Sequence, residues 1–85
     1  MKVEKYEIPA STMARIEGAM RSKPSFRTAE IAAMVEAIAN GAGDGDLLRR
    51  AYRVADRLIT RERQSLVKVS LEGQRVRWGW KAAAP

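Results

Sequence analysis

The chain contains no cysteine and no histidine. Disulfide bonds, thiol chemistry and zinc fingers built from Cys and His ligands are therefore excluded. Without these side chains, general acid–base catalysis would need paired carboxylates, and the ten Asp and Glu residues are scattered or serve as helix caps. We predict that the protein is not an enzyme and that it uses no cofactor and no metal ion.

The chain also lacks any apolar run near the ~20 residues that a membrane-spanning helix needs. Residues 1–8 carry charges of both signs and contain no apolar segment of the kind found in signal peptides. A basic amphipathic helix can lie on an anionic membrane, but a domain this small needs the apolar side of its helices for its own core. We expect a cytoplasmic protein with no membrane partner.

Positive charge is what the chain has in excess. It has 85 residues, enough for one small domain, with 16 Lys and Arg against ten Asp and Glu and a net charge of +6. Residues 1–43 hold six basic and five acidic side chains, whereas residues 44–85 hold ten and five. The excess in the second half indicates an anionic partner: nucleic acid, an acidic protein surface or an anionic membrane.

Apolar periodicity and turn signals predict three helices followed by a β-hairpin. The expected order is an N-terminal arm at 1–10, a helix capped at Ser11 or Thr12 and ended by Pro24, a helix from Thr28 to Asn40–Gly41, a Gly-rich loop at 40–46, a helix over 46–63 and a hairpin that ends near Trp80. The domain then spans residues 11–81, and residues 82–85 form a frayed tail.

The third helix is expected to begin at a cap, Asp44 or Asp46, and to turn toward the core an apolar side that includes Tyr52. It also carries five arginines within one arc, whereas its acidic residues Asp56 and Glu62 lie toward the flanks of that arc. Like charges four residues apart destabilise a helix by a few tenths of a kcal/mol per pair, so an unneutralised stripe indicates a bound polyanion. The alternative is a solvated charged face. If the helix enters a major groove, we expect Arg49, Arg50 and Arg53 to read bases and Arg57 and Arg61 to contact phosphates.

The hairpin is expected to turn at Glu72–Gly73, because this places its apolar side chains on one face. The resulting pairs are Leu71 with Gln74, Val69 with Val76 and Val67 with Trp78. On the outward face Lys68 then lies opposite Arg77, and Arg75 lies beside Ser70. These three cations either contact a polyanion or protect an edge strand from aggregation.

This order of elements, with a short extended piece before the second helix, resembles the winged helix-turn-helix superfamily. The matching stretch runs from Ser11 to Trp80, with FRTAEIAAMV similar to the entry of the family's second helix and LVKVSLEGQRVRWGW similar to its wing. The resemblance implies an α+β fold with a third helix in the major groove, a wing on the neighbouring backbone or minor groove, and Thr28 at a backbone phosphate. The seven-residue Gly-rich loop departs from a tight helix-turn-helix and leaves the angle of the third helix open.

We therefore expect a small DNA-binding protein, a transcriptional regulator or accessory factor on the nucleoid, with duplex DNA as its partner. The alternatives are a protein-interaction module that binds an acidic partner and an RNA- or ribosome-binding protein, since phosphate contacts look alike in RNA and DNA. A homodimer would use Tyr6 and Ile8 of the arm or the edge at Trp80, and the small size suits a phage or mobile element. The residues expected to contact nucleic acid are Thr28, Arg49, Arg50, Arg53, Arg57, Arg61, Lys68, Arg75 and Arg77.

Overall fold

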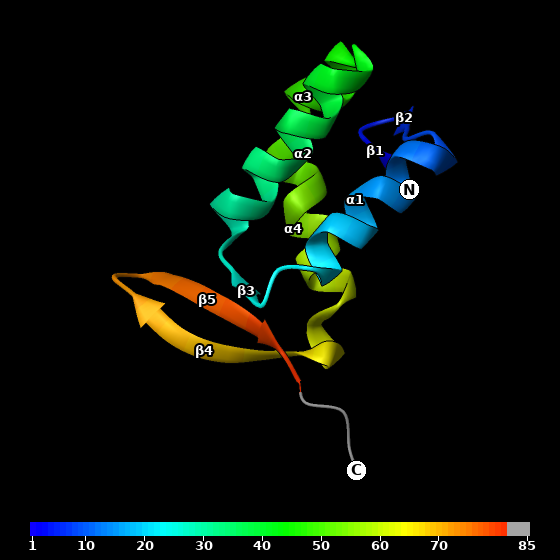
Figure 1. Ribbon diagram of the computed structural model, residues 1–85. Helices are drawn as coiled ribbons and strands as arrows, with labels where there is room; N and C mark the ends of the chain where they lie inside the picture. Colours follow the sequence, from blue (N-terminus) through cyan, green and yellow to red (C-terminus); the bar gives the residue numbers. More distant parts are fainter. Residues whose placement is uncertain (82–85) are drawn as a thin grey trace.

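A computed structural model of the chain describes residues 1–81, so the expected tail at 82–85 lies outside the described residues. The described part has an α+β fold with four α-helices and small antiparallel sheets (Figure 1). Its elements are β1 (Lys2–Val3), β2 (Tyr6–Glu7), α1 (Ala10–Arg21), β3 (Ser25–Phe26), α2 (Thr28–Ala42), α3 (Gly45–Arg49), α4 (Ala51–Arg61), the 3-10 helix η1 (Arg63–Ser65), β4 (Leu66–Glu72) and β5 (Arg75–Trp80).

The core lies between the helices and the base of the three-stranded sheet. Helix α2 packs against α1, α3 and α4, and the β4–β5 hairpin projects sideways from the lower end of this group (Figure 1). Phe26, Leu66 and Trp78 carry the core from the helices into the sheet. Each large apolar side chain buried here contributes about 1.5–3 kcal/mol, which a domain of this size needs in full.

The long helix expected over residues 46–63 is divided into α3 and α4 at Arg50, whose backbone leaves helical geometry at φ −104°, ψ 9°. The guanidinium of Arg50 donates to the carbonyl oxygen of Asp46 at 2.9 Å. In a continuous helix that carbonyl would accept from the Arg50 amide, which instead donates to Leu47 O at 3.0 Å. The Arg50 side chain thus takes the place of one backbone hydrogen bond, and the helix bends at Arg50.

The prediction of a Gly-rich loop over residues 40–46 was also wrong, because most of these residues are helical. Helix α2 continues to Ala42, held by the fully buried Ala39, and ends where Gly43 adopts the left-handed conformation at φ 66°. Asp44 then caps α3, accepting from the Leu47 amide at 3.0 Å, as its position before the helix predicted. Two residues therefore separate α2 from α3, and the angle between them is fixed.

The C-terminal hairpin, β4 and β5 with their turn, differs in register from the sequence prediction. Its turn is Gly73–Gln74, with Gly73 at φ 66°, and Glu72 pairs with Arg75. A bulge at Val69 shifts the register again before Lys68 pairs with Trp78. The predicted single apolar face is lost, because Val67, Val69 and Leu71 are 41%, 57% and 68% exposed.

Strand β5 lies in the middle of the sheet, which has the order β3-β5-β4. Trp80 therefore offers no free sheet edge to a second copy, contrary to the expectation, and its indole Nε1 donates to Lys23 O at 3.0 Å. The free edge of the C-terminal hairpin is β4.

The expected N-terminal arm is folded onto the body. Residues 1–8 form a small hairpin, called here the N-terminal hairpin, in which Lys2 pairs with Glu7. Val3 and Ile8 are each 2% exposed and belong to the core, and Tyr6 is half-buried against it. The side chain of Ile8 is covered within its own chain and is not free to supply the expected dimer contact, whereas Tyr6 stays partly exposed.

Gly79 provides a test of the sheet packing. A Cβ added there would lie 2.7 Å from Val69 Cγ2, a stiff β-branched side chain, so the strands must move apart. We expect Gly79→Ala to lower the free energy of unfolding by about 1 kcal/mol or more in urea or thermal unfolding. Gly18→Ala is the matched control in α1, where no atom lies within 4 Å, and should raise stability by about 0.5–1 kcal/mol. Equal stability of the Gly79→Ala and wild-type proteins would contradict this packing.

Candidate nucleic-acid interface

Helix α4 has one buried and one exposed side. Its buried side chains belong to the core and are Ala51, Val54, Ala55, Leu58 and Ile59. The opposite side, called here the α4 face, carries Tyr52, Arg53, Asp56, Arg57 and Thr60, all exposed. Asp56, expected toward the flank of the arginine arc, is exposed on this side of α4. The prediction that Tyr52 lies in the core was wrong, because Tyr52 is 53% exposed.

Arg49 and Arg50 do not belong to the α4 face. Arg49 pairs with Asp46 at 2.6 Å, one turn earlier in α3. The Arg50 side chain is 20% exposed and lies between Asp46, Glu4 and the ring of Tyr6, whose centroid is 5.6 Å from the guanidinium carbon. We conclude that Arg50, expected to read bases, joins the α3–α4 junction to the N-terminal hairpin. Arg49, also expected to read bases, is paired within α3.

Arg53 and Arg57 remain available on the α4 face. The Arg53 side chain is 71% exposed, its ion pair with Glu4 is made at Nε, 3.4 Å away, and its terminal nitrogens donate no hydrogen bond within residues 1–81. Arg57 is exposed, donates one hydrogen bond to Lys2 O at 3.0 Å, and forms no ion pair within residues 1–81. Both retain donors in the fork geometry that binds a phosphate or a guanine edge.

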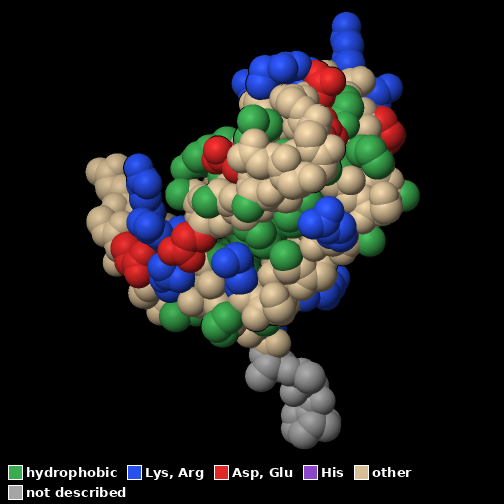
Figure 2. All heavy atoms as spheres, turned by 45° about the horizontal axis from the view of Figure 1, so that its top comes forward, with side chains coloured by type: hydrophobic (Ala, Val, Ile, Leu, Met, Phe, Trp, Pro, Cys, Tyr) green, Lys and Arg blue, Asp and Glu red, His purple; other side chains and the backbone are tan. Residues whose placement is uncertain are grey.

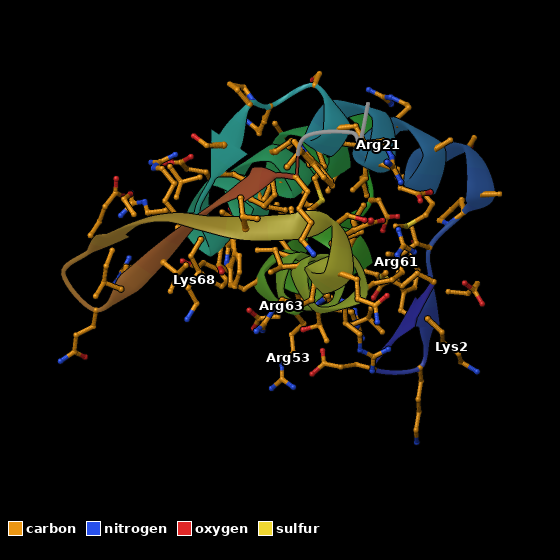
Figure 3. The ribbon with its side chains drawn as sticks, turned by 90° about the horizontal axis from the view of Figure 1, so that it is seen from below. Lys2, Arg21, Arg53, Arg61, Arg63 and Lys68 are labelled. Atoms are coloured by element: carbon orange, nitrogen blue, oxygen red, sulfur yellow. The ribbon has the colours of Figure 1, made fainter. Side chains whose placement is uncertain are left out.

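Arg61 is turned away from the α4 face toward α1. Its Nη2 lies 2.8 Å from Glu17 of α1, and Glu62 lies 3.8 Å from its Nε. Figure 3 shows Arg61 on the α1 side of α4, apart from Arg53 and Arg63. The expected phosphate contact of Arg61 therefore conflicts with the ion pair that joins two helices.

Arg77 is the centre of an ion-pair network rather than an outward cation opposite Lys68. It pairs with Glu30 at 2.8 Å and with Glu72 at 3.0 Å, and it donates to Ser25 Oγ at 3.2 Å. Hydrogen bonding to Arg77 lowers the pKa of Glu30, and the two carboxylates raise the pKa of Arg77. Figure 2 shows acidic and basic side chains side by side at the end of the molecule that carries the C-terminal hairpin.

Lys68 and Arg75 are exposed, as the sequence predicted, and form no ion pair within the described residues. Thr28 opens α2 without capping it, since the residue before the helix is Arg27. An open cleft of about 410 Å³ lies between α2, α4 and the C-terminal hairpin, and its lining comprises Arg27, Thr28, Ala29, Tyr52, Asp56, Gln74, Arg75, Val76 and Trp78.

Arg63 and Lys2 are exposed cations that the sequence reasoning missed. Arg63 stacks over Trp78, with its guanidinium carbon 4.8 Å from the ring centroid. Figure 3 looks along α4 and shows Arg53 and Arg63 pointing to one side, with Lys68 and Lys2 on either flank. Arg63 was missed because it neighbours Tyr52 on the helical wheel, and Tyr52 was assigned to the core.

The N-terminal hairpin is tied to the α3 cap through Tyr6. The phenol of Tyr6 donates to Asp44, whose other oxygen accepts from the Leu47 amide. This hydrogen bond raises the pKa of Tyr6 to about 12 and lowers the pKa of Asp44. The contact therefore places the hairpin beside the start of α3.

Within residues 1–81, no three acidic side chains are grouped so that they could hold a metal ion, and no helix is long and apolar enough to cross a membrane. Comparisons of the chain with protein-family models, with curated protein sequences and with solved structures find no match.

The Arg77 network predicts a pH-dependent stability difference. A carboxyl whose pKa is lowered by folding stabilises the protein above its ordinary pKa, and the effect disappears as pH falls through the lowered pKa. We expect Arg77→Ala to lower Tm at pH 7, and the difference from wild type to shrink as pH falls below the ordinary Glu30 value of 4.5. Arg75→Ala, on the same strand but without an ion pair, should leave Tm nearly unchanged. A Tm difference that persists unchanged at low pH would contradict the network.

Tyr6 predicts a second, alkaline transition. A phenol whose pKa is raised by folding stabilises the protein below its ordinary pKa, and this contribution is lost as pH rises from 10.0 toward 12. In Tyr52→Phe, where Tyr6 is the remaining tyrosine, absorbance titration should give a pKa near 12. The urea-unfolded variant should titrate near 10.0, and the same midpoint in the folded protein would rule out the Tyr6–Asp44 hydrogen bond.

Proposed function

We propose that this protein binds duplex DNA through the α4 face, as a small transcriptional regulator or accessory DNA-binding factor. The observation that carries the proposal is the collection of exposed cations without a full acidic partner on one side of α4. Arg53 and Arg57 come from the helix, Arg63 follows it, and Lys68 comes from β4 (Figure 3). Asp56 is the one carboxylate of the α4 face and leaves the surface basic.

The arrangement of elements supports the same proposal. A short strand between two helices, a turn into α3 and α4, and a C-terminal hairpin are compatible with the winged-helix arrangement that the sequence resembles. In that arrangement the last helix enters the major groove and the hairpin meets the adjacent backbone. The two-residue connection between α2 and α3 removes the long loop that separated the sequence from a tight helix-turn-helix.

The electrostatics of the α4 face favour a bound polyanion. Arg53 and Arg57 are four residues apart, where like charges repel by a few tenths of a kcal/mol. Neighbouring phosphates would relieve that repulsion. Arg63 is held against Trp78, so it loses less side-chain freedom than a free arginine when it binds.

We assign Arg53 to base contact because it lies in the first turn of α4 and its side chain is 71% exposed. Arg57, Arg63, Lys68 and Arg75 are assigned to phosphates. Arg49, Arg50, Arg61 and Arg77 are assigned to the structure, since their guanidinium groups are paired with carboxylates.

A titration of labelled duplex about two helical turns long, at two salt concentrations, tests the proposal. We expect salt-dependent binding, with Arg57→Gln weaker for all sequences and its salt slope reduced by about one. Arg53→Ala should change the preferred sequence in selection from a randomised duplex pool.

Arg15→Gln is the control, because Arg15 is exposed on α1 and forms no ion pair within residues 1–81. It should bind like wild type. Negligible duplex affinity at ~50 mM salt, where phosphate contacts are strongest, would reject the proposal. A stoichiometric protein partner that depends on Arg53 and Arg57, without nucleic acid, would replace it with the protein-interaction alternative.

A further inference from the structure

The N-terminal hairpin is fixed along one flank of the α4 face. Val3 and Ile8 anchor it in the core. Arg57 donates to the backbone oxygen of Lys2, and Glu4 lies 3.6 Å from Arg50 and 3.4 Å from Arg53. Its position relative to α4 is therefore set by contacts on both its apolar and its polar side.

The two carboxylates of the N-terminal hairpin form ion pairs, whereas its two lysines form none within residues 1–81. Glu4 faces the arginines, and Glu7 pairs with the amino group of Met1 at 2.9 Å. Lys2 and Lys5 are exposed and form no ion pair within residues 1–81. Both acids are thus neutralised by the protein, and both lysines face solvent.

The turn of the N-terminal hairpin is strained. Glu4 and Lys5 have φ values of 50° and 69°, in the left-handed region where Asn and Gly are usual. Non-glycine residues in this region are strained and persist only where the surroundings hold them. The contacts of Glu4 with Arg50 and Arg53 are such a restraint, and Lys5 is held beside it at the tip.

Lys2 lies across α4 from Lys68. Figure 3 shows the two lysines on opposite flanks of the helix, with Arg53 and Arg63 between them. An open cleft of about 610 Å³ separates the N-terminal hairpin from the helix on the Lys2 side, lined by Met1, Lys2, Asp56, Arg57, Thr60 and Arg61. The α4 face is therefore bordered by cations on both sides.

We infer that the N-terminal hairpin is a second phosphate-binding element, which binds the phosphates of one strand of duplex DNA while the C-terminal hairpin binds those of the other. The inference rests on the proposed function. An α-helix with its side chains is about 10–12 Å wide and a B-form major groove is about 12 Å wide. Cations on both flanks of a helix in that groove face both of its phosphate walls.

This placement selects the kind of nucleic acid. A single strand offers one backbone and can engage the cations of one flank at a time. The major groove of A-form RNA is deep and narrow and does not admit a helix. Cations on both flanks of a convex helix therefore fit B-form DNA.

The test compares Lys2→Gln, Lys5→Gln and Lys68→Gln with Arg15→Gln, on DNA duplex, RNA duplex and single-stranded DNA of one sequence. For DNA duplex, each lysine variant should reduce the salt slope by about one and the affinity at ~0.1 M salt by about tenfold. The Lys2→Gln and Lys68→Gln effects should add in the double variant, since the two residues contact different strands. Circular dichroism and Tm should match wild type because all three lysines are exposed.

Two results would separate this inference from the proposed function. If Arg57→Gln weakens duplex binding while Lys2→Gln and Lys5→Gln bind like wild type with an unchanged salt slope, the N-terminal hairpin is not a phosphate-binding element and the α4 face still is. Tighter binding to RNA duplex or to single-stranded DNA than to DNA duplex would also overturn the inference that the two hairpins bind the two strands of duplex DNA. A wild-type protein without affinity for DNA duplex would overturn both proposals.

Discussion

Arg50 is the point at which three parts of the chain are joined. Its guanidinium takes the Asp46 carbonyl out of the helical pattern, so α3 and α4 meet at a bend. The same group stacks on Tyr6 and lies near Glu4, which holds the N-terminal hairpin in place. Because that hairpin covers one flank of α4, the position of Arg50 decides which arginines remain exposed. Arg50, which was expected to contact nucleic acid, thus determines the shape of the surface that is proposed to make that contact.

The division of the arginines into paired and available sets changes the meaning of the net charge. Arg49, Arg61 and Arg77 form ion pairs that link elements or turns, and partly exposed pairs of this kind contribute little stability singly. Their main effect is to fix geometry. The positive charge available to a partner is therefore smaller than the composition suggests.

Local features were predictable from the sequence. The α+β class, the hairpin after the last helix, the apolar side of α4 and the Asp44 cap follow from patterns within a few residues. Asp46 meets Arg49 and Arg50 from three and four residues away, so these pairs are also local. The partners of Arg61 and Arg77 were not predictable in the same way, because Glu17 meets Arg61 from 44 residues away and Glu30 meets Arg77 from 47. A helical wheel does not contain Glu17, so it shows Arg61 in a stripe of like charge where the fold pairs it with α1. The hairpin register depended on the left-handed Gly73 and on a bulge, and alternation alone specifies neither.

The open edge of β4 places two demands on Lys68. An exposed edge strand that carries Val67, Val69 and Leu71 is a template for pairing with other chains. The bulge at Val69 and the charge of Lys68 are the features of this strand that oppose such pairing. If the same lysine also meets a phosphate, DNA affinity and colloidal solubility cannot be varied separately at this position. A substitution that weakens DNA binding by removing the charge of Lys68 would expose β4 to aggregation, whereas a substitution at Arg57 would not.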